Sequence, residues 1–308
     1  MHFKVLGNIS LLLVLLSIFL CEVKSQEFVS IPINVLRNKT IVPVKVGQSR
    51  TLDILLDTGM SFDGLLIYNP DLTDSIILDN GMEIQLSGAG KGKPTTAMMD
   101  TCAQFSIGDF EFKKQKLLLL QNDMYKGFPS DGVLGYSIFG HFAVELDYDK
   151  DVMMLHNHKG LTLDKSWDSI PIYFKKNTIP WIDVSVVIEN EAPIRISTYI
   201  DFAAGETIEL LEKADMKFSL PNNLREAYLG RGLSGDIYGK RGTIKKLIIG
   251  NYELNNLNAA VAPAAVRSKQ ENADAIIGCG SLRRFNLIFD YQHKKLFLKP
   301  NSFFTTMN

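Results

Sequence analysis

Cysteine, tryptophan and histidine are scarce in this chain. Its 308 residues include three cysteines, two tryptophans and five histidines. Apart from Cys21 near the N-terminus, only Cys102 and Cys279 remain, and they do not occupy matching positions in the repeat described below. So few cysteines exclude a disulfide framework, and we expect two buried free thiols, with a single bridge as the alternative.

No sign of charge dominates the sequence. Lysine and arginine number 33 and aspartate and glutamate 34, so the net charge is −1. The basic residues are scattered rather than gathered on one face, which disfavours nucleic-acid binding. The sequence also lacks a Gly-x-Ser-x-Gly elbow, a Walker loop, a zinc-peptidase histidine pair and a dinucleotide fingerprint, and these absences remove several enzyme classes.

Long hydrophobic runs are absent except at the N-terminus. Residues 9–21 form an apolar run that is too short to span a bilayer comfortably but suits the core of a signal peptide. Val23 and Ser25 then place compact residues three and one positions before a cleavage point. We therefore predict a signal peptide over residues 1–25, a mature chain that begins at Gln26, and export to the periplasm or the medium without a stable membrane span.

Cys21 offers an alternative to soluble export. A cysteine directly after an apolar run can carry a lipid anchor. Leu20 before it is bulky where such sites take a small residue, so soluble export is the favoured interpretation.

What the sequence does contain is an internal repeat. The first and second halves share landmarks in the same order, and the offset (second number minus first) stays close to 142 residues. This pattern indicates a duplication with two similar lobes, which we place at residues 26–160 and 161–308. The paired landmarks are Ser30 with Ser169, Asp57 with Asp201, Gly88 with Gly230, Ile107 with Ile249 and Gly135 with Gly278, at offsets of 139, 144, 142, 142 and 143.

Short apolar runs separated by turn residues predict strands in both halves. We expect a closing hairpin in each lobe, with a short helix before it. Only residues 209–214 and 222–228 carry helix formers elsewhere in a plausible register. The predicted class is all-β with two lobes. The expected strands cover residues 28–35, 40–46, 142–148 and 152–155 in the first half, and 170–174, 181–188, 194–201, 286–291 and 295–298 in the second.

Two strand ends carry an aspartate in matching frames. The first reads Leu56-Asp57-Thr58-Gly59 and the second Ile200-Asp201-Phe202-Ala203, and each lobe later has a hydrophobic-hydrophobic-Gly motif ending in Gly135 or Gly278. With these motifs in this order, the chain resembles the aspartic peptidase superfamily over about residues 28–300, and more closely the exported bacterial proteins with two retropepsin-like repeats. The resemblance implies two β-barrel lobes related by a pseudo-twofold axis, with a cleft between them.

The resemblance also implies a catalytic pair, Asp57 and Asp201. Peptide hydrolysis without a metal needs one group to take a proton from water and another to protonate the carbonyl oxygen. Two carboxyls held about 3 Å apart cannot both ionise, so they share a proton, as is known for aspartic peptidases. Thr58 and Gly59 would support the aspartate loop. The implied substrate is a peptide or protein, the implied state is a monomer, and neither cofactor nor metal is implied.

Glycine-rich hairpin tips at residues 88–92 and 230–235 would then form a lid over the substrate. For any one of these glycines, an ordinary exposed turn is the alternative. Met60 stands where the family commonly has a small residue, so it would trim or line the cleft.

The second aspartate motif departs from the family pattern. Phe202 removes the threonine hydroxyl, and a methyl group at Ala203 would cost about 1–3 kcal/mol if the turn needs left-handed geometry. Two alternatives follow. The chain is a non-catalytic peptide- or glycan-binding protein on the same scaffold, or only Asp57 is functional and a second chain completes the site.

Other polar residues have simpler interpretations. His156-Asn157-His158 suggests a metal site, but no third ligand stands at a supporting spacing, so we expect a solvated turn. Asp147 and Asp290 recur before tyrosines in the closing hairpins, and we expect them to accept structural hydrogen bonds.

Overall fold

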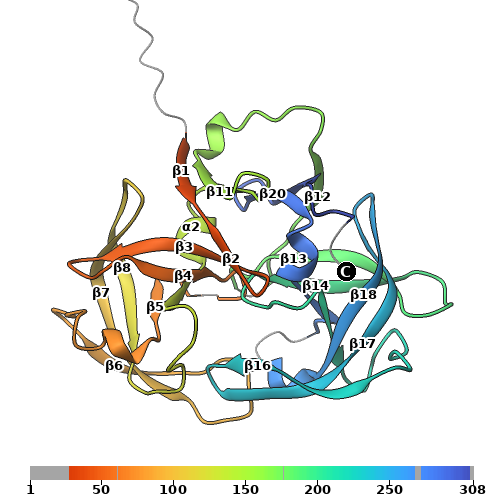
Figure 1. Ribbon diagram of the computed structural model, residues 1–308, viewed down its shortest axis with the longest axis horizontal. Helices are drawn as coiled ribbons and strands as arrows, with labels where there is room; N and C mark the ends of the chain where they lie inside the picture. The colour runs from red at the N-terminus through yellow and green to blue at the C-terminus, as the bar shows by residue number, and fades with distance from the viewer. Residues whose placement is uncertain (1–27, 61, 176, 268–271, 306–308) are drawn as a thin grey trace, which may run out of the picture.

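The computed structural model describes residues 28–60, 62–175, 177–267 and 272–305, and this part of the chain is almost entirely β-structure (Figure 1). The predicted signal peptide and Cys21 lie outside the described residues. No helix within the described ranges is long and apolar enough to cross a bilayer. The all-β class with two barrel-like lobes is confirmed.

An eight-stranded sheet, which we call the N lobe, lies at the left of Figure 1. Its strand order is β2-β3-β4-β9-β5-β8-β7-β6, and a further pairing of β3 with β7 closes it into a barrel. β4 runs parallel to β9. The strands are β2 (Asn34–Leu36), β3 (Lys39–Val46), β4 (Leu52–Leu56), β5 (Leu65–Ile67), β6 (Met82–Leu86), β7 (Thr95–Ile107), β8 (Phe110–Leu120) and β9 (Gly132–Leu134).

A seven-stranded sheet, the C lobe, repeats this topology on the right of Figure 1. Its strand order is β13-β14-β19-β15-β18-β17-β16. Without β2, the N lobe has the corresponding order β3-β4-β9-β5-β8-β7-β6, and β13 pairs with β17 as β3 does with β7. β14 runs parallel to β19. The strands are β13 (Trp181–Val187), β14 (Ile194–Asp201), β15 (Ile208–Glu212), β16 (Arg225–Gly232), β17 (Gly235–Ile249), β18 (Tyr252–Pro263) and β19 (Ala275–Gly278).

A third sheet of six strands joins the lobes, in the order β1-β11-β10-β20-β21-β12. The two predicted closing hairpins meet at its centre, where β10 pairs antiparallel with β20 and Val144 lies opposite Phe289. The predicted short helices, α2 (Tyr136–Phe139) and α3 (Cys279–Leu282), precede these hairpins. The strands are β1 (Phe28–Pro32), β10 (Ala143–Asp147), β11 (Val152–His156), β12 (Asp168–Pro171), β20 (Phe285–Asp290) and β21 (Lys295–Pro300); the 3-10 turns are η1 (Pro70–Leu72), η2 (His158–Gly160) and η3 (Ala264–Arg267).

The two helices predicted over residues 209–214 and 222–228 are wrong. The first region lies mostly in β15, which pairs with β18 on one side and β19 on the other. Burial on both faces and hydrogen bonding at both edges override a weak helix propensity. The second region is a turn that leads into β16, which pairs with β17 along most of its length.

The thiol prediction is half right. Cys102 and Cys279 are both unpaired, but Cys102 is exposed and only Cys279 is buried. Cys102 lies in β7 just after Asp100, where the register with β8 shifts, so its side chain faces outward.

Aromatic packing connects the third sheet to both lobes, and it gives a test of the fold. Phe289 is fully buried, and its ring lies edge-on to Phe139 at 5.3 Å and to Phe202 at 5.4 Å between centroids. Phe289→Ala should lower the free energy of unfolding by about 3–5 kcal/mol, measured by urea denaturation. Tyr238→Ala removes a ring that is 64% exposed and should change it by less than about 0.5 kcal/mol. Equal effects of the two substitutions would contradict this core.

Candidate active site

Asp57 and Asp201 lie at equivalent places in the two lobes. Each stands at the end of a strand, β4 or β14, that runs parallel to the strand with the hydrophobic-hydrophobic-Gly motif. The backbone N–H of Asp57, directly after β4, donates to the carbonyl oxygen of Leu134 at 2.9 Å. Asp201 is the last residue of β14, opposite Gly278 of β19. Because neighbouring parallel strands end at the same edge, each aspartate projects from the end of its lobe's central strand pair.

Thr58 connects the two aspartate loops. Its hydroxyl donates to the carbonyl oxygen of Ile200 at 2.9 Å and accepts from the backbone N–H of Phe202 at 3.1 Å. Both contacts are buried and join residues more than 140 positions apart. Gly59 faces the second carboxyl so closely that a Cβ there would lie 2.8 Å from Cγ of Asp201. The structure thus brings Asp57, Thr58, Gly59 and Asp201 together.

The two carboxyls have different surroundings. Oδ1 of Asp201 accepts the backbone N–H groups of Ala203 at 2.9 Å and Ala204 at 3.1 Å. Oδ1 of Asp57 is buried and has no hydrogen-bond partner among the described residues. A buried acceptor without a partner is uncommon in folded proteins and marks a group available for chemistry.

Burial raises the pKa of both carboxyls, because a charged carboxylate loses its hydration there. The negative charge of Asp201 raises the pKa of Asp57 further. The Arg267 guanidinium and the N–H groups of Ala203 and Ala204 oppose the rise in pKa at Asp201, and the N–H groups of Gly59 and Met60 oppose it at Asp57. Two such groups cannot both be ionised at low cost, so the pair holds a proton at pH values where an ordinary aspartate has lost it.

Phe202 compensates for the missing threonine by packing. Its side chain is fully buried, with its ring 6.4 Å from that of Phe139 and 5.4 Å from that of Phe289. The condition for strain at Ala203, a left-handed backbone, is not met, since the residues with positive φ in the described chain do not include it. The turn therefore accepts a methyl group in ordinary backbone geometry, and only the second threonine hydroxyl is lost.

The glycine-rich hairpin tips of the two lobes touch each other. The N–H of Ser234 donates to the carbonyl oxygen of Ala89 at 2.9 Å, and the N–H of Gly92 donates to the carbonyl oxygen of Ser234 at 2.5 Å. Leu233 at the C-lobe tip packs against the same apolar cluster as Met60 and Ala203, which flank the aspartates. The tips of the β6–β7 and β16–β17 hairpins therefore meet over the aspartate loops, and Met60 lies against this cluster, where it was expected to line the cleft.

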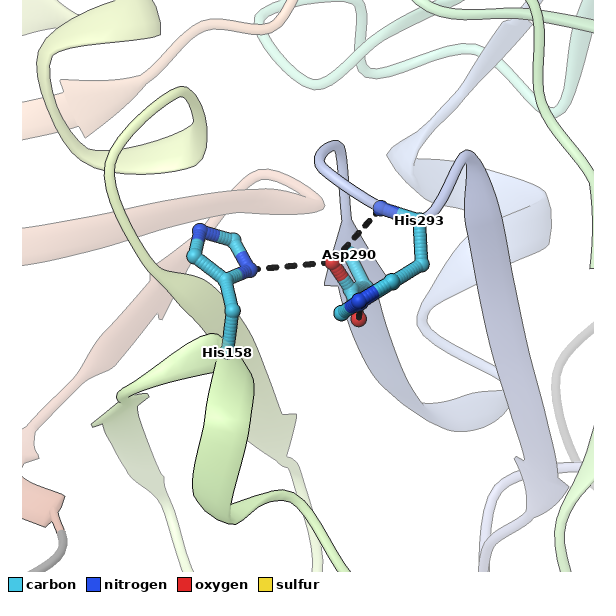
Figure 2. Close-up of side chains that lie close together, drawn as sticks. All are labelled: His158, Asp290 and His293. Atoms are coloured by element: carbon cyan, nitrogen blue, oxygen red, sulfur yellow. Dashed lines mark hydrogen bonds and ion pairs between the residues drawn. The ribbon is translucent and has the colours of Figure 1, made fainter.

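His158 does not lie in the expected solvated turn, and Asp290 and His293, which no sequence spacing indicated as ligands, lie beside it (Figure 2). Its side chain is 9% exposed, and its Nδ1 lies 3.0 Å from Oδ1 of Asp290. Nδ1 of His293 lies 2.6 Å from the other oxygen of Asp290. Sequence spacing hid this group because Asp290 and His293 come from the closing hairpin of the other half.

This histidine–aspartate group offers nitrogen and oxygen atoms that metals accept. Both imidazoles, however, already lie within hydrogen-bonding distance of the carboxylate. The equivalent hairpin of the first half, β10–β11, also has a cation on its aspartate, with Nζ of Lys150 donating to Asp147 at 2.6 Å. Asp147 and Asp290 thus accept the structural hydrogen bonds predicted for them, and those from His293 and His158 help to hold the pKa of Asp290 below its usual range despite its burial.

Sequence reasoning missed two charged residues beside Asp201. Glu209 and Arg267 form a buried ion pair through two hydrogen bonds of 2.9 Å. A signal was present, because Glu209 follows Leu66 by 143 residues, the offset of the repeat (209 − 66). An acidic residue at a position that is apolar in the other half points to a local change of function.

Comparisons with known proteins agree with this geometry. A family model described as aspartyl protease matches residues 42–138, which include Asp57 and Gly135. Among solved structures, the chain is similar to the crystal structure of an aspartic proteinase from Irpex lacteus, with a TM-score of 0.56 and 15% sequence identity over 91% of this chain and 100% of that chain. A search among curated proteins gave no match. The family match covers residues 42–138 of the first lobe, and the structural similarity shows a shared fold over most of the chain.

The Thr58 link predicts a stability effect. Thr58→Val keeps the shape of the side chain but leaves the carbonyl of Ile200 and the N–H of Phe202 buried without a partner. The free energy of unfolding should fall by about 1–3 kcal/mol in urea denaturation. Thr58→Ser retains the hydroxyl and should recover most of the loss. A valine variant as stable as the wild type would show that the two loops do not depend on this contact.

The raised carboxyl pKa values predict how stability depends on pH. A carboxyl with a raised pKa in the folded state stabilises the fold below its unfolded value of 3.8, and this contribution is lost as pH rises through the folded pKa. Asp57→Asn mimics the protonated form at every pH. It should match the wild type near pH 3 and be more stable by about 1 kcal/mol or more at pH 7. Unfolding free energies at the two pH values test this, and a variant less stable than the wild type at pH 7 would contradict it.

Proposed function

We propose that the protein is an aspartic-type endopeptidase in which Asp57 and Asp201 form the catalytic pair. The observation that carries this proposal is the meeting of two buried aspartate loops, joined by Thr58, in a site where one proton must be shared. The match of residues 42–138 to the aspartyl protease family model supports the reaction class, and the retention of a carboxylate in the altered second motif supports a working pair.

The reaction needs only a water molecule and the two carboxyls. The ionised carboxylate takes a proton from water while the oxygen of that water attacks the carbonyl carbon of the scissile peptide bond. The protonated carboxyl gives its proton to the carbonyl oxygen, which yields a neutral tetrahedral diol. Collapse of the diol breaks the C–N bond as the leaving nitrogen receives a proton, and the pair returns to its singly protonated state.

The touching hairpin tips suit a lid over an extended substrate. Such a substrate would bind by strand-like backbone hydrogen bonds, which give affinity with little dependence on sequence. The tips meet through hydrogen bonds around Ser234 and through the packing of Leu233 and Ala89 on apolar clusters, and these contacts would have to break for the lid to open. A closed lid excludes bulk water from the carboxyls during the reaction.

We extend the proposal to the setting of the protein. The apolar run at residues 9–21 supports export with removal of residues 1–25. Because one chain supplies both aspartates, the active form would be a monomer.

Substitution of either aspartate tests the proposal. Asp57→Asn and Asp201→Asn should each reduce cleavage of a broad peptide library by about 10³-fold or more, because each removes a group that transfers a proton in the transition state. A statine-type inhibitor should block the wild type. As a control, Asp215→Asn changes a side chain that is 81% exposed, and this variant should cleave the library like the wild type.

The outcomes separate the alternatives. Full activity in either asparagine variant would contradict the catalytic pair. Binding of peptides by the wild type without turnover, from acidic to neutral pH, would instead favour a binding protein on the same scaffold.

A further inference from the structure

The two lobes differ at one buried position on the sheet face that carries the aspartates. In the N lobe, Leu66 of β5 lies opposite Val133 of β9. In the C lobe, Glu209 of β15 lies opposite Ile276 of β19. Leu66 belongs to an apolar cluster, whereas the side chain of Glu209 is 2% exposed and carries a carboxylate.

Glu209 is separated from the second aspartate strand by a single strand. Ile276 lies between Glu209 on one side and Tyr199 of β14 on the other. Tyr199 precedes Asp201 by two residues, and residues two apart on a strand point to the same face. The carboxylate of Glu209 therefore lies on the face of the sheet toward which Asp201 points.

Arg267 binds this carboxylate from the side of the lid. Its Nε and Nη2 donate to the two oxygens of Glu209, each at 2.9 Å, and its side chain is 13% exposed. Arg267 ends η3, and the carbonyl oxygen of the preceding Val266 accepts the N–H of Gly90 from the N-lobe tip. The guanidinium thus stands where the lid meets the sheet face of Asp201.

Stability alone does not account for a buried ion pair at this position. Paired charges lose their hydration on burial, and replacing them with apolar side chains is often neutral or stabilising. In the N lobe the equivalent position holds an apolar side chain, Leu66. The charged pair in the C lobe therefore needs another explanation.

The charged groups around the two aspartates are unequal. Arg267 is the strongest charged influence on Asp201 and favours its ionised form, and it outweighs the opposing effect of Glu209. For Asp57 the favourable cation is Lys39, whose effect is smaller than those of burial, of Asp201 and of the two loop N–H groups. The other titratable groups that face Asp201 are Tyr199 and Cys279, and those that face Asp57 are Tyr68, Tyr125, Tyr199 and Tyr291.

We propose that the Glu209–Arg267 pair is a positioning element that holds the negative charge of the catalytic pair on Asp201 and leaves the shared proton on Asp57. This inference rests on the proposed function. It assigns the two roles, with Asp201 as the base that takes the proton of water and Asp57 as the acid that protonates the carbonyl oxygen. Two loop N–H groups act on each aspartate, those of Gly59 and Met60 on Asp57 and those of Ala203 and Ala204 on Asp201, so the asymmetry between the two comes from the ion pair.

The test uses two substitutions with opposite expected effects on the acidic limb of the pH profile of kcat/KM. Arg267→Gln removes the cation, so this limb should move to higher pH by about one pH unit. Glu209→Gln leaves the cation uncompensated, so the limb should move to lower pH. Structural damage would lower activity in both variants without moving their limbs in opposite directions. Movement in the same direction, or none in either variant, would overturn the proposal.

Two controls keep the result interpretable. Arg267→Lys retains the charge but loses the two-pronged contact, so its limb should stay near that of the wild type, and it replaces Arg267→Gln as the charge test if the latter does not fold. Lys246→Gln breaks a surface pair with Glu253 and should leave the profile unchanged. A limb displaced equally in the lysine and glutamine variants would mean that packing, not charge, sets the profile.

A second readout does not need turnover. Carboxyl ¹³C NMR titration, with Asp57→Asn and Asp201→Asn used for assignment, follows each aspartate directly. Failure of the proposed function would appear as no cleavage by the wild type while the Asp201 signal still responds to Arg267→Gln. Failure of this inference would appear as normal cleavage with an Asp201 titration that neither substitution alters.

Discussion

Two carboxyl groups that repel each other when ionised lie partly buried at the meeting point of the lobes, and the fold must hold them there. The buried Thr58 hydroxyl, which bonds to both backbone neighbours of Asp201, and the absence of a side chain at Gly59 provide that constraint. The barrels supply strands that end at the right place, and the six-stranded sheet fixes one barrel against the other. Burial then makes ionisation of both groups costly, so that a proton is retained between them.

The lobes share a topology, and the places where they differ are chemically informative. Thr58 has no counterpart in the second loop, where Phe202 packs into the core shared with Phe139 and Phe289. The Thr58 hydroxyl thus makes by itself the hydrogen bonds to Ile200 and Phe202 that join the two loops. Leu66 and Glu209 also occupy equivalent positions in the two lobes. There the difference introduces a charged side chain beside Asp201 and none beside Asp57. A single chain with two lobes can adopt such asymmetry, whereas a symmetric dimer of identical chains cannot.

Local sequence pattern predicted the parts of the fold that local physics decides. The alternating strands, the closing hairpins and the short helices before them follow from apolar periodicity and turn residues, and the repeat predicted which aspartates would meet. The helix predicted at 209–214 failed because the neighbours of β15 on both sides, β18 and β19, come from later in the chain. The partner of His158 and the pair of Glu209 with Arg267 were missed for the same reason, since the paired residues lie 132 and 58 positions apart. The strain considered at Ala203 assumed a left-handed backbone, which that residue does not adopt.

The central claim, that the buried aspartates act as one proton-sharing unit, is tested most directly by counting protons. Difference titration of the folded wild type against the folded double variant Asp57→Asn/Asp201→Asn isolates the two carboxyls. The account predicts two well-separated steps of one proton each, with the second clearly above the ordinary aspartate pKa of about 3.9. Release of both protons together near that ordinary value would show that the carboxyls titrate independently, and would contradict it.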